Sequence, residues 1–227
     1  MPEFSTDQLF ARLKASCIDD WQAYTGHDFV HQLANGTLAE TAFRHYLGQD
    51  YLFLVHFARA YALAAYKTTD LGEMREAIAA VDNILNTEMA LHIEYCQGWG
   101  LDETAMTALP EAKATMAYTR FVLESGMAGD SLDLYVALAP CVIGYGEIGA
   151  ALAADPGTVL ADNSYASWIE MYASADYQEV ALGADAQLDR LGEQRLTPAR
   201  FEALARTFRQ ATRLEADFWQ MGLTLAP

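Results

Sequence analysis

The sequence is poor in cysteine and in basic residues. Its 227 residues include three cysteines, an odd number with no Cys-x-x-Cys pair and no Cys/His cluster. Neither a disulfide framework nor a structural zinc site is therefore indicated. Only 14 Lys and Arg residues stand against 31 Asp and Glu residues, which gives a formal net charge of −17. Because phosphate backbones and anionic lipids are bound by Lys/Arg patches, this charge argues against nucleic acid and membrane partners.

Long apolar runs and common nucleotide motifs are also missing. No stretch of about 18 uninterrupted apolar residues occurs, and Met1–Ser5 lacks the basic and then apolar order of a signal peptide. We therefore expect a soluble, cytoplasmic protein. The chain has no G-x-G-x-x-G, Walker A or G-x-S-x-G motif, which removes the usual signals for dinucleotide, nucleotide and hydrolase-elbow sites.

The histidines do not form a metal motif. None of the five follows a Glu by three residues, so the paired Glu-x-x-His motif of di-iron bundles is absent. The nearest patterns are Asp28-x-x-His31 and Glu88-x-x-x-His92. For the second, an exposed or satisfied pair on one helix face is the commoner explanation. We expect neither a metal nor a cofactor.

Proline is scarce, and the few prolines leave long segments in which helices can form. Between the six prolines, apolar residues recur every three or four positions rather than every two, the period of an amphipathic helix. With 52% hydrophobic residues and no linker-like segment, the predicted fold is an all-α multi-helix bundle in one domain, residues 1–227. Capping patterns at Ser5–Gln8, Thr37–Glu40 and Thr197–Pro198 mark three helix starts. The spacing predicts helices over residues 5–24, 28–34, 39–66, 71–98, 111–126, 131–153, 162–174, 176–192 and 198–223.

Two carboxylates interrupt the apolar stripes of these helices. Asp50 lies one heptad after Phe43 and one before Phe57, and Glu215 lies two heptads after Phe201. Burying an unpartnered carboxylate costs several kcal/mol, so apolar residues normally hold such positions. Taken alone, each carboxylate is explained equally well by a structural contact with a helix end or an Arg. Together with a reactive cysteine, the two indicate a pocket.

That cysteine is Cys141. A free cysteine usually packs as a small hydrophobic residue, and we expect this of Cys17 and Cys96. Cys141 differs because it lies in Leu138–Gly146, a stretch of small residues with one proline and two glycines. Small residues let a ligand approach the backbone. We therefore predict that Cys141 lines the pocket.

Three tyrosines are further candidates. Tyr118, Tyr145 and Tyr172 fall on apolar faces of their predicted helices, and a buried tyrosine hydroxyl usually makes a hydrogen bond. Aromatic residues at helical spacing are more often core than binding site. These three become site candidates only beside the acidic residues and the cysteine.

The segments Gln49–Ala58, Leu138–Cys141 and Glu215–Met221 carry a family resemblance. Their order and spacing, with supporting segments over nearly the whole chain, resemble the TenA family, also called thiaminase II or aminopyrimidine aminohydrolase, in its cysteine-containing type. The resemblance implies a heme-oxygenase-like helical bundle without heme, assembled as a homotetramer. It also implies salvage of the pyrimidine half of degraded thiamin, without cofactor or metal.

The resemblance also implies roles for individual residues. Cys141 matches the catalytic cysteine of the family, Glu215 its acid/base carboxylate, and Asp50 the carboxylate that pairs with the aminopyrimidine edge. The aromatic wall is matched by Tyr118, Tyr145 and Tyr172. Phe53 is a departure, because some members carry a tyrosine there whose hydroxyl supports the cysteine and the glutamate. We expect this change to alter rate or substrate preference more than reaction type.

Other functions remain open from the sequence. One is a cofactor-free or metal oxidase on the same scaffold, which the missing His/carboxylate ligand set disfavours. Another is a non-catalytic regulator, for which the net charge of −17 is unfavourable. The residues also leave open whether the pyrimidine substrate is thiamin, an aminomethylpyrimidine or a formylated relative.

Overall fold

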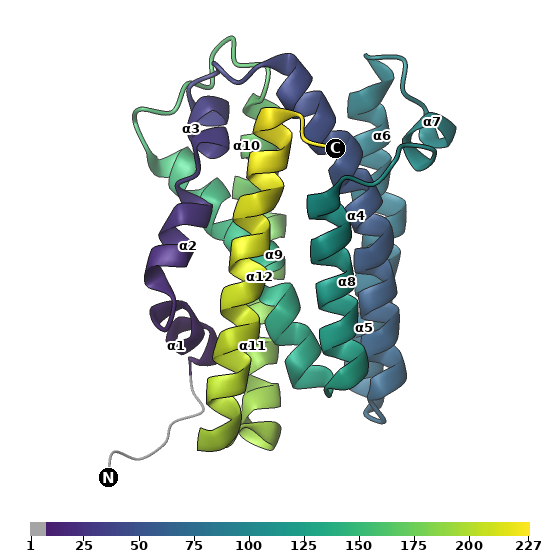
Figure 1. Cartoon of the computed structure of the whole chain (residues 1–227), viewed down its shortest axis with the longest axis vertical. Coiled ribbons are helices and arrows are strands. Elements are labelled where there is room, and N and C mark those ends of the chain that lie inside the picture. Colours follow the sequence, from purple (N-terminus) through teal and green to yellow (C-terminus); the bar gives the residue numbers. More distant parts are fainter. Residues whose placement is uncertain (1–7) are drawn as a thin grey trace. The chain divides into compact units, whose positions relative to one another are not determined.

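The computed structural model describes residues 8–227, and every regular element within them is a helix (Figure 1). This confirms the all-α prediction. The elements are α1 (Leu9–Ala15), α2 (Ile18–Thr25), α3 (Asp28–Ala34), α4 (Glu40–Lys67), α5 (Leu71–Asn83), the π-helical turn η1 (Ile84–Glu88), α6 (Met89–Gln97), α7 (Glu103–Thr107), α8 (Lys113–Ala128), α9 (Ser131–Ala154), α10 (Ala166–Ala173), α11 (Ala175–Arg195) and α12 (Pro198–Thr224).

Most predicted helices are confirmed to within a few residues, and two are divided. The helix predicted over 5–24 is two helices, because Cys17 leaves the helical conformation with φ −143° and ψ 41°. Its predicted start, Ser5–Asp7, lies outside the described residues. The helix predicted over 71–98 contains the π-helical turn η1 between α5 and α6. Helix α7 was not predicted, although Asp102 caps it by accepting a 2.8 Å hydrogen bond from the Ala105 amide.

The predicted caps have mixed outcomes. Thr197 caps α12, since its hydroxyl accepts a 3.2 Å hydrogen bond from the Arg200 amide. The capping box predicted at Thr37 is wrong. Residue Ala39 is the N-cap of α4 and makes no side-chain cap bond. The Thr37 hydroxyl instead donates to Asn35 Oδ1 at 2.6 Å, because a local turn competes for it.

The chain forms two compact units. One comprises the N-terminal segment through Leu38 together with Tyr135–Trp219, and the other comprises Ala39–Leu134 with Gln220–Pro227. We call them the Cys141 unit and the Asp50 unit, after a candidate residue in each. Two of the three boundaries fall inside helices, in α9 and in α12, and the third falls after Leu38, just before α4. The prediction of one domain over residues 1–227 stays a prediction.

In the Asp50 unit, α4 packs against α5, α8 and α6, and Figure 1 shows α4, α5 and α8 side by side. A buried amide fixes the start of α8 on α4. The Gln49 side chain donates to the Pro110 carbonyl at 3.0 Å. Its Oε1 accepts from the Ala112 amide and the Thr115 hydroxyl, both at 2.8 Å. Because all its polar atoms are satisfied, Gln49 can be buried at low cost and hold both helices in register.

In the Cys141 unit, close packing on α9 depends on glycine. A Cβ at Gly144 would lie 2.6–2.7 Å from the Tyr24 ring and hydroxyl, and one at Gly149 would lie 2.5 Å from the Tyr172 backbone. The Tyr24 hydroxyl also donates to the carbonyl of Pro140 at 3.2 Å. The missing side chains therefore let α2 and α10 lie directly against α9.

Helix α9 is long and apolar enough to cross a membrane by length and composition alone. However, 67% of its apolar window is buried inside the structure. That burial is the pattern of a core helix, and its apolar character is explained by the packing described above.

Candidate functional site

The seven predicted site residues divide between the two units. The Asp50 unit holds Asp50, Phe53 and Tyr118, and the Cys141 unit holds Cys141, Tyr145, Tyr172 and Glu215. Six of the seven are buried, as the apolar stripes predicted. Cys141 alone is partly exposed, whereas Cys17 and Cys96 are buried.

Asp50 is a buried carboxylate with a basic partner. It is 5% exposed, and its Oδ2 lies 2.7 Å from Nε2 of His92 on α6. The Tyr46 hydroxyl, one turn earlier on α4, lies 3.4 Å from the same oxygen. No residue in the described part of the chain hydrogen-bonds Oδ1 of Asp50. Asp50 therefore has one engaged oxygen and one available oxygen.

The two hydrogen bonds of the His92 ring show how many protons the pair of Asp50 and His92 carries. Its Nδ1 is 2.9 Å from the backbone carbonyl of Glu88, which can only accept, so Nδ1 carries a hydrogen. The 2.7 Å contact between Nε2 and Asp50 then requires a second proton. Asp50 and His92 therefore share one proton and form a pair with no net charge.

Electrostatics favour the imidazolium form of His92. Burial alone lowers its pKa, but the hydrogen bond and charge of Asp50 and the charge of Glu88 raise the pKa above its ordinary value. Burial raises the pKa of Glu88 to about 7, with His92 opposing the shift and Asp50 adding to it. Glu88 is partly buried in η1. The charges of Asp50 and Glu88 both act on His92.

Sequence reasoning missed His92 as a site residue. The Glu88-x-x-x-His92 spacing was interpreted as an exposed or satisfied pair, whereas His92 is 4% exposed and its partner lies on another helix. The spacing was the only signal, and it could not show that Asp50, 42 positions earlier, is the partner.

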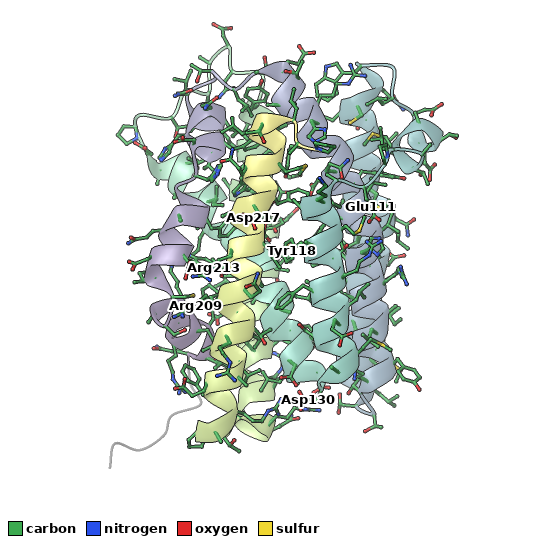
Figure 2. All side chains as sticks on the ribbon, in the orientation of Figure 1. Glu111, Tyr118, Asp130, Arg209, Arg213 and Asp217 are labelled. Carbon is green, nitrogen blue, oxygen red and sulfur yellow. The ribbon has the colours of Figure 1, made fainter. Side chains whose placement is uncertain are left out.

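Phe53 and Tyr118 form an aromatic contact in the Asp50 unit. Their ring centroids are 5.0 Å apart, and Phe53 also lies 5.5 Å from Phe57. Figure 2 shows Tyr118 on α8, the helix whose start is fixed by Gln49. The Phe53 ring has no hydroxyl, so it offers only apolar and ring contacts at this position.

The small-residue stretch around Cys141 has a different role from the predicted one. The glycines were expected to let a ligand approach the backbone. Instead, Gly144 is covered by Tyr24, and a Cβ at Gly146 would lie 2.9 Å from Ala181 of α11. This expectation is therefore corrected, because helix packing occupies the space left by both glycines. The partial exposure of Cys141 remains its distinguishing property.

Tyr145 and Tyr172 meet in an aromatic cluster of the Cys141 unit. Their centroids are 4.9 Å apart, and Trp168 lies 5.9 Å from Tyr145 and 4.5 Å from Tyr172. Gln178 fixes the two helices, since its Nε2 donates to the carbonyls of Gly146 at 2.9 Å and Tyr172 at 2.8 Å. The cluster gives α9 and α10 a rigid aromatic face.

Glu215 lies on the buried side of α12 and is 1% exposed. The opposite side carries Arg209, Arg213 and Asp217 (Figure 2). On that exposed side, Arg213 donates to Asp20 of α2 at 2.8 Å. The carboxylate of Glu215 therefore lies in the interior, away from bulk water.

The other cysteines behave as predicted. Burial raises the pKa of Cys17, and it raises the pKa of Cys96 to about 11. Thiols of this kind are poor nucleophiles near neutral pH. Among residues 8–227, no group of three or more His, Cys, Asp and Glu side chains is arranged to hold a metal ion.

Known proteins match the chain over most of its length. An aminopyrimidine aminohydrolase from Halalkalibacterium halodurans is 35% identical over 202 residues, which cover 88% of this chain and 89% of that protein. An uncharacterized protein of Haemophilus influenzae is 41% identical over 206 residues, covering 91% and 94%. The crystal structure of a TenA family transcription regulator from Silicibacter sp. TM1040 has a TM-score of 0.90 at 45% identity, covering 96% and 97%.

A more distant structure bears on the fold alone. A domain of unknown function from Shewanella denitrificans, described as having a heme oxygenase-like fold, has a TM-score of 0.73 at 15% identity. It covers 95% of this chain and 92% of that domain, which confirms the predicted heme-oxygenase-like fold. The model of the TENA/THI-4/PQQC family matches residues 16–225. The chain therefore belongs to the TENA/THI-4/PQQC family.

Proposed function

We propose that this protein is a hydrolase of thiamin salvage that releases 4-amino-5-hydroxymethyl-2-methylpyrimidine. Its substrate would be an aminomethylpyrimidine or thiamin itself. The observation that supports this most directly is the buried carboxylate of Asp50, with one oxygen held by His92 and one available. Further support comes from a relative named aminopyrimidine aminohydrolase, which is 35% identical to this chain over 88% of its length.

Asp50 would bind and orient the pyrimidine. An aminopyrimidine presents an amino donor beside a ring nitrogen, and an ionised carboxylate pairs with such an edge and favours protonation of the ring. Protonation makes the ring carbons electrophilic. Tyr118, Tyr145 and Tyr172 would contact the heterocycle through their rings or hydroxyls, and apolar surroundings would strengthen the charge interactions by excluding water.

Cys141 and Glu215 would perform the bond changes. The Cys141 thiolate adds to the ring carbon next to the one bearing the aminomethyl group, and the C–N bond breaks as Glu215 gives a proton to the leaving amine. Water, deprotonated by Glu215, then adds to the exocyclic carbon. The C–S bond breaks, and the aromatic ring is restored. Support comes from Cys141 being the one partly exposed cysteine of the three and from the burial of Glu215.

The test is turnover of 4-amino-5-aminomethyl-2-methylpyrimidine, followed through release of ammonia and of the hydroxymethylpyrimidine. We expect turnover by the parent protein and none by Cys141→Ala, with Cys17→Ala as the matched control that keeps activity. Asp50→Ala should mainly lose substrate binding. Turnover by a folded Cys141→Ala protein would remove the assignment of the nucleophile.

A regulatory role is the second candidate, because the Silicibacter relative at 45% identity is described as a transcription regulator. The net charge of −17 opposes DNA binding. A salt-dependent shift of DNA mobility on addition of the protein would favour this role over catalysis.

We also propose a cytoplasmic homotetramer. Support for self-association comes from an apolar stripe along α5 and η1, in which Leu71, Ile78 and Leu85 are 61%, 53% and 48% exposed. The half-buried Met74 and Val81 fall between them. These five residues, which we call the α5 stripe, have the heptad spacing of helix–helix interfaces.

A further inference from the structure

His92, the partner of Asp50, and Glu88 beside it have no task in the mechanism above. We propose that His92 is a positioning residue for that mechanism, whose Nε2–H holds Oδ2 of Asp50 so that Oδ1 stays available to the pyrimidine. This inference rests on the proposed function. It concerns how the substrate carboxylate is kept in one orientation.

The geometry shows that His92 can hold Asp50 only through the hydrogen on Nε2. Its Nδ1–H is committed to the Glu88 carbonyl at 2.9 Å, so the hydrogen in the 2.7 Å contact with Asp50 is the only other one the ring can carry. If the pair loses that proton, two lone pairs face each other at a distance suited to a strong hydrogen bond. They would repel, and the Asp50 side chain would lose its fixed orientation.

The π-helical turn explains how His92 reaches Asp50. Turn η1 interrupts the helix that the apolar period predicted over 71–98, and α6 follows it directly. A π-turn inserts one residue, which rotates everything after it by about 100° around the axis. The inserted residue lies immediately before the segment that carries His92. Such turns are frequently found at functional sites.

Among residues 8–227, the side chains of Tyr46 and Glu88 act on this pair. Asp50 meets Tyr46 on its own helix and His92 on α6. Glu88, on η1, interacts electrostatically with both Asp50 and His92. Because an ionised Glu88 raises the pKa of His92, it extends the range in which the imidazolium persists toward higher pH. Glu88 itself ionises near neutral pH, since burial raises its pKa to about 7.

The pH dependence of binding follows from these contacts. As pH rises through the pKa of His92 in the folded protein, Asp50 loses its holding hydrogen bond and the pyrimidine should bind more weakly. Replacing Glu88 with glutamine removes the anion that stabilises the imidazolium. The alkaline decline in binding should then begin at lower pH.

The experiment measures the dissociation constant of 4-amino-5-hydroxymethyl-2-methylpyrimidine by calorimetry from about pH 6 to about pH 9. This range contains the ordinary pKa of a histidine side chain. The proteins are the parent, His92→Gln, His92→Asn and Glu88→Gln. Glutamine places an amide nitrogen near the position of Nε2, whereas asparagine places one near Nδ1. The ligand's own titration is common to all four.

We expect His92→Gln to bind without an alkaline decline, because its amide does not titrate, and Glu88→Gln to decline at lower pH than the parent. His92→Asn should bind about tenfold or more weakly, the loss expected for a charge-assisted hydrogen bond. Should His92→Asn prove unstable by circular dichroism, the other two variants still decide the question.

Two results separate this inference from the proposed function. A parent protein that fails to bind the pyrimidine at any pH overturns the proposed function, and the inference with it. A parent that binds, with the same alkaline decline in His92→Gln, overturns the role of His92 alone.

Discussion

At the scale of single residues, Asp50 and His92 are stable in the interior as a pair. Each would be costly to bury alone, but sharing one proton makes them neutral together, and Tyr46 and the Glu88 carbonyl satisfy further hydrogen bonds. Removing one partner of a buried pair generally costs more than the pair contributes, because a charge is left unpaired. The pair is therefore a fixed part of the interior that also presents a free oxygen.

Phe53 supports a prediction about rate. Phe53→Tyr introduces the hydroxyl that the family resemblance leads us to expect in some members, and we expect turnover of the aminomethylpyrimidine to rise or its preference over thiamin to change. The measurement is kcat/KM for both substrates. Phe57→Tyr is the matched control, since Phe57 is the neighbouring buried ring on α4. Equal effects of the two variants would mean that the hydroxyl has no specific role at residue 53.

Glu88 supports a prediction about stability. Its pKa is raised to about 7 in the fold from 4.5, so ionisation favours the unfolded chain as pH rises between these values. The resulting loss of folding stability is absent below about pH 4.5, grows toward pH 7 and is constant above it. Glu88→Gln removes it, so the gain in Tm should be larger at pH 8 than at pH 5. We would measure both by thermal unfolding; a gain independent of pH would contradict the shifted ionisation.

At the scale of elements, the buried Gln49 amide joins α4 to the start of α8. Gln49→Leu leaves the Pro110 carbonyl, the Ala112 amide and the Thr115 hydroxyl without their partner. We expect a loss of about 2–4 kcal/mol of unfolding free energy, since unsatisfied buried polar groups cost about 1–3 kcal/mol each. Chemical denaturation measures this loss. Thr115→Val, which breaks one of the three bonds, should cost clearly less.

The long helices could be predicted because their apolar period is uninterrupted and their ends carry turn residues. The break at Cys17 and the turn η1 could not be predicted, because the helical period is the same on both sides of each break and only its phase changes. Helix α7 is too short for a period to appear. The shorter α10 begins at Ala166 because Asn163 holds the preceding segment, donating to the Leu33 carbonyl at 3.0 Å.

The candidate site was also predicted only in part. Burial of Asp50 and Glu215 could be predicted from their places in apolar stripes. The contact of Asp50 with His92 could not be predicted, because it joins residues 42 positions apart and His92 follows the unpredicted π-helical turn η1. The glycines near Cys141 were misinterpreted, since a small residue fits a ligand and a neighbouring helix equally well.

At the scale of the whole molecule, self-association should depend on the α5 stripe. Ile78→Arg places a charge at its centre, so we expect a smaller assembly than the parent forms, measured by size-exclusion chromatography with light scattering. Ala79→Arg is the control, because Ala79 is exposed on the same helix but lies about 100° away from Ile78. An assembly of unchanged mass in Ile78→Arg would place the interface elsewhere.

The boundaries inside α9 and α12 have a consequence for how the protein is made. Neither unit is a continuous segment: the chain leaves the Cys141 unit after Leu38, returns to it at Tyr135 and leaves it again after Trp219. A domain encoded in one piece can fold while translation continues. Here, both units include residues of α12, so the Cys141 unit is complete only after the ribosome has added residue 219. Truncation upstream of α12 therefore leaves both units incomplete.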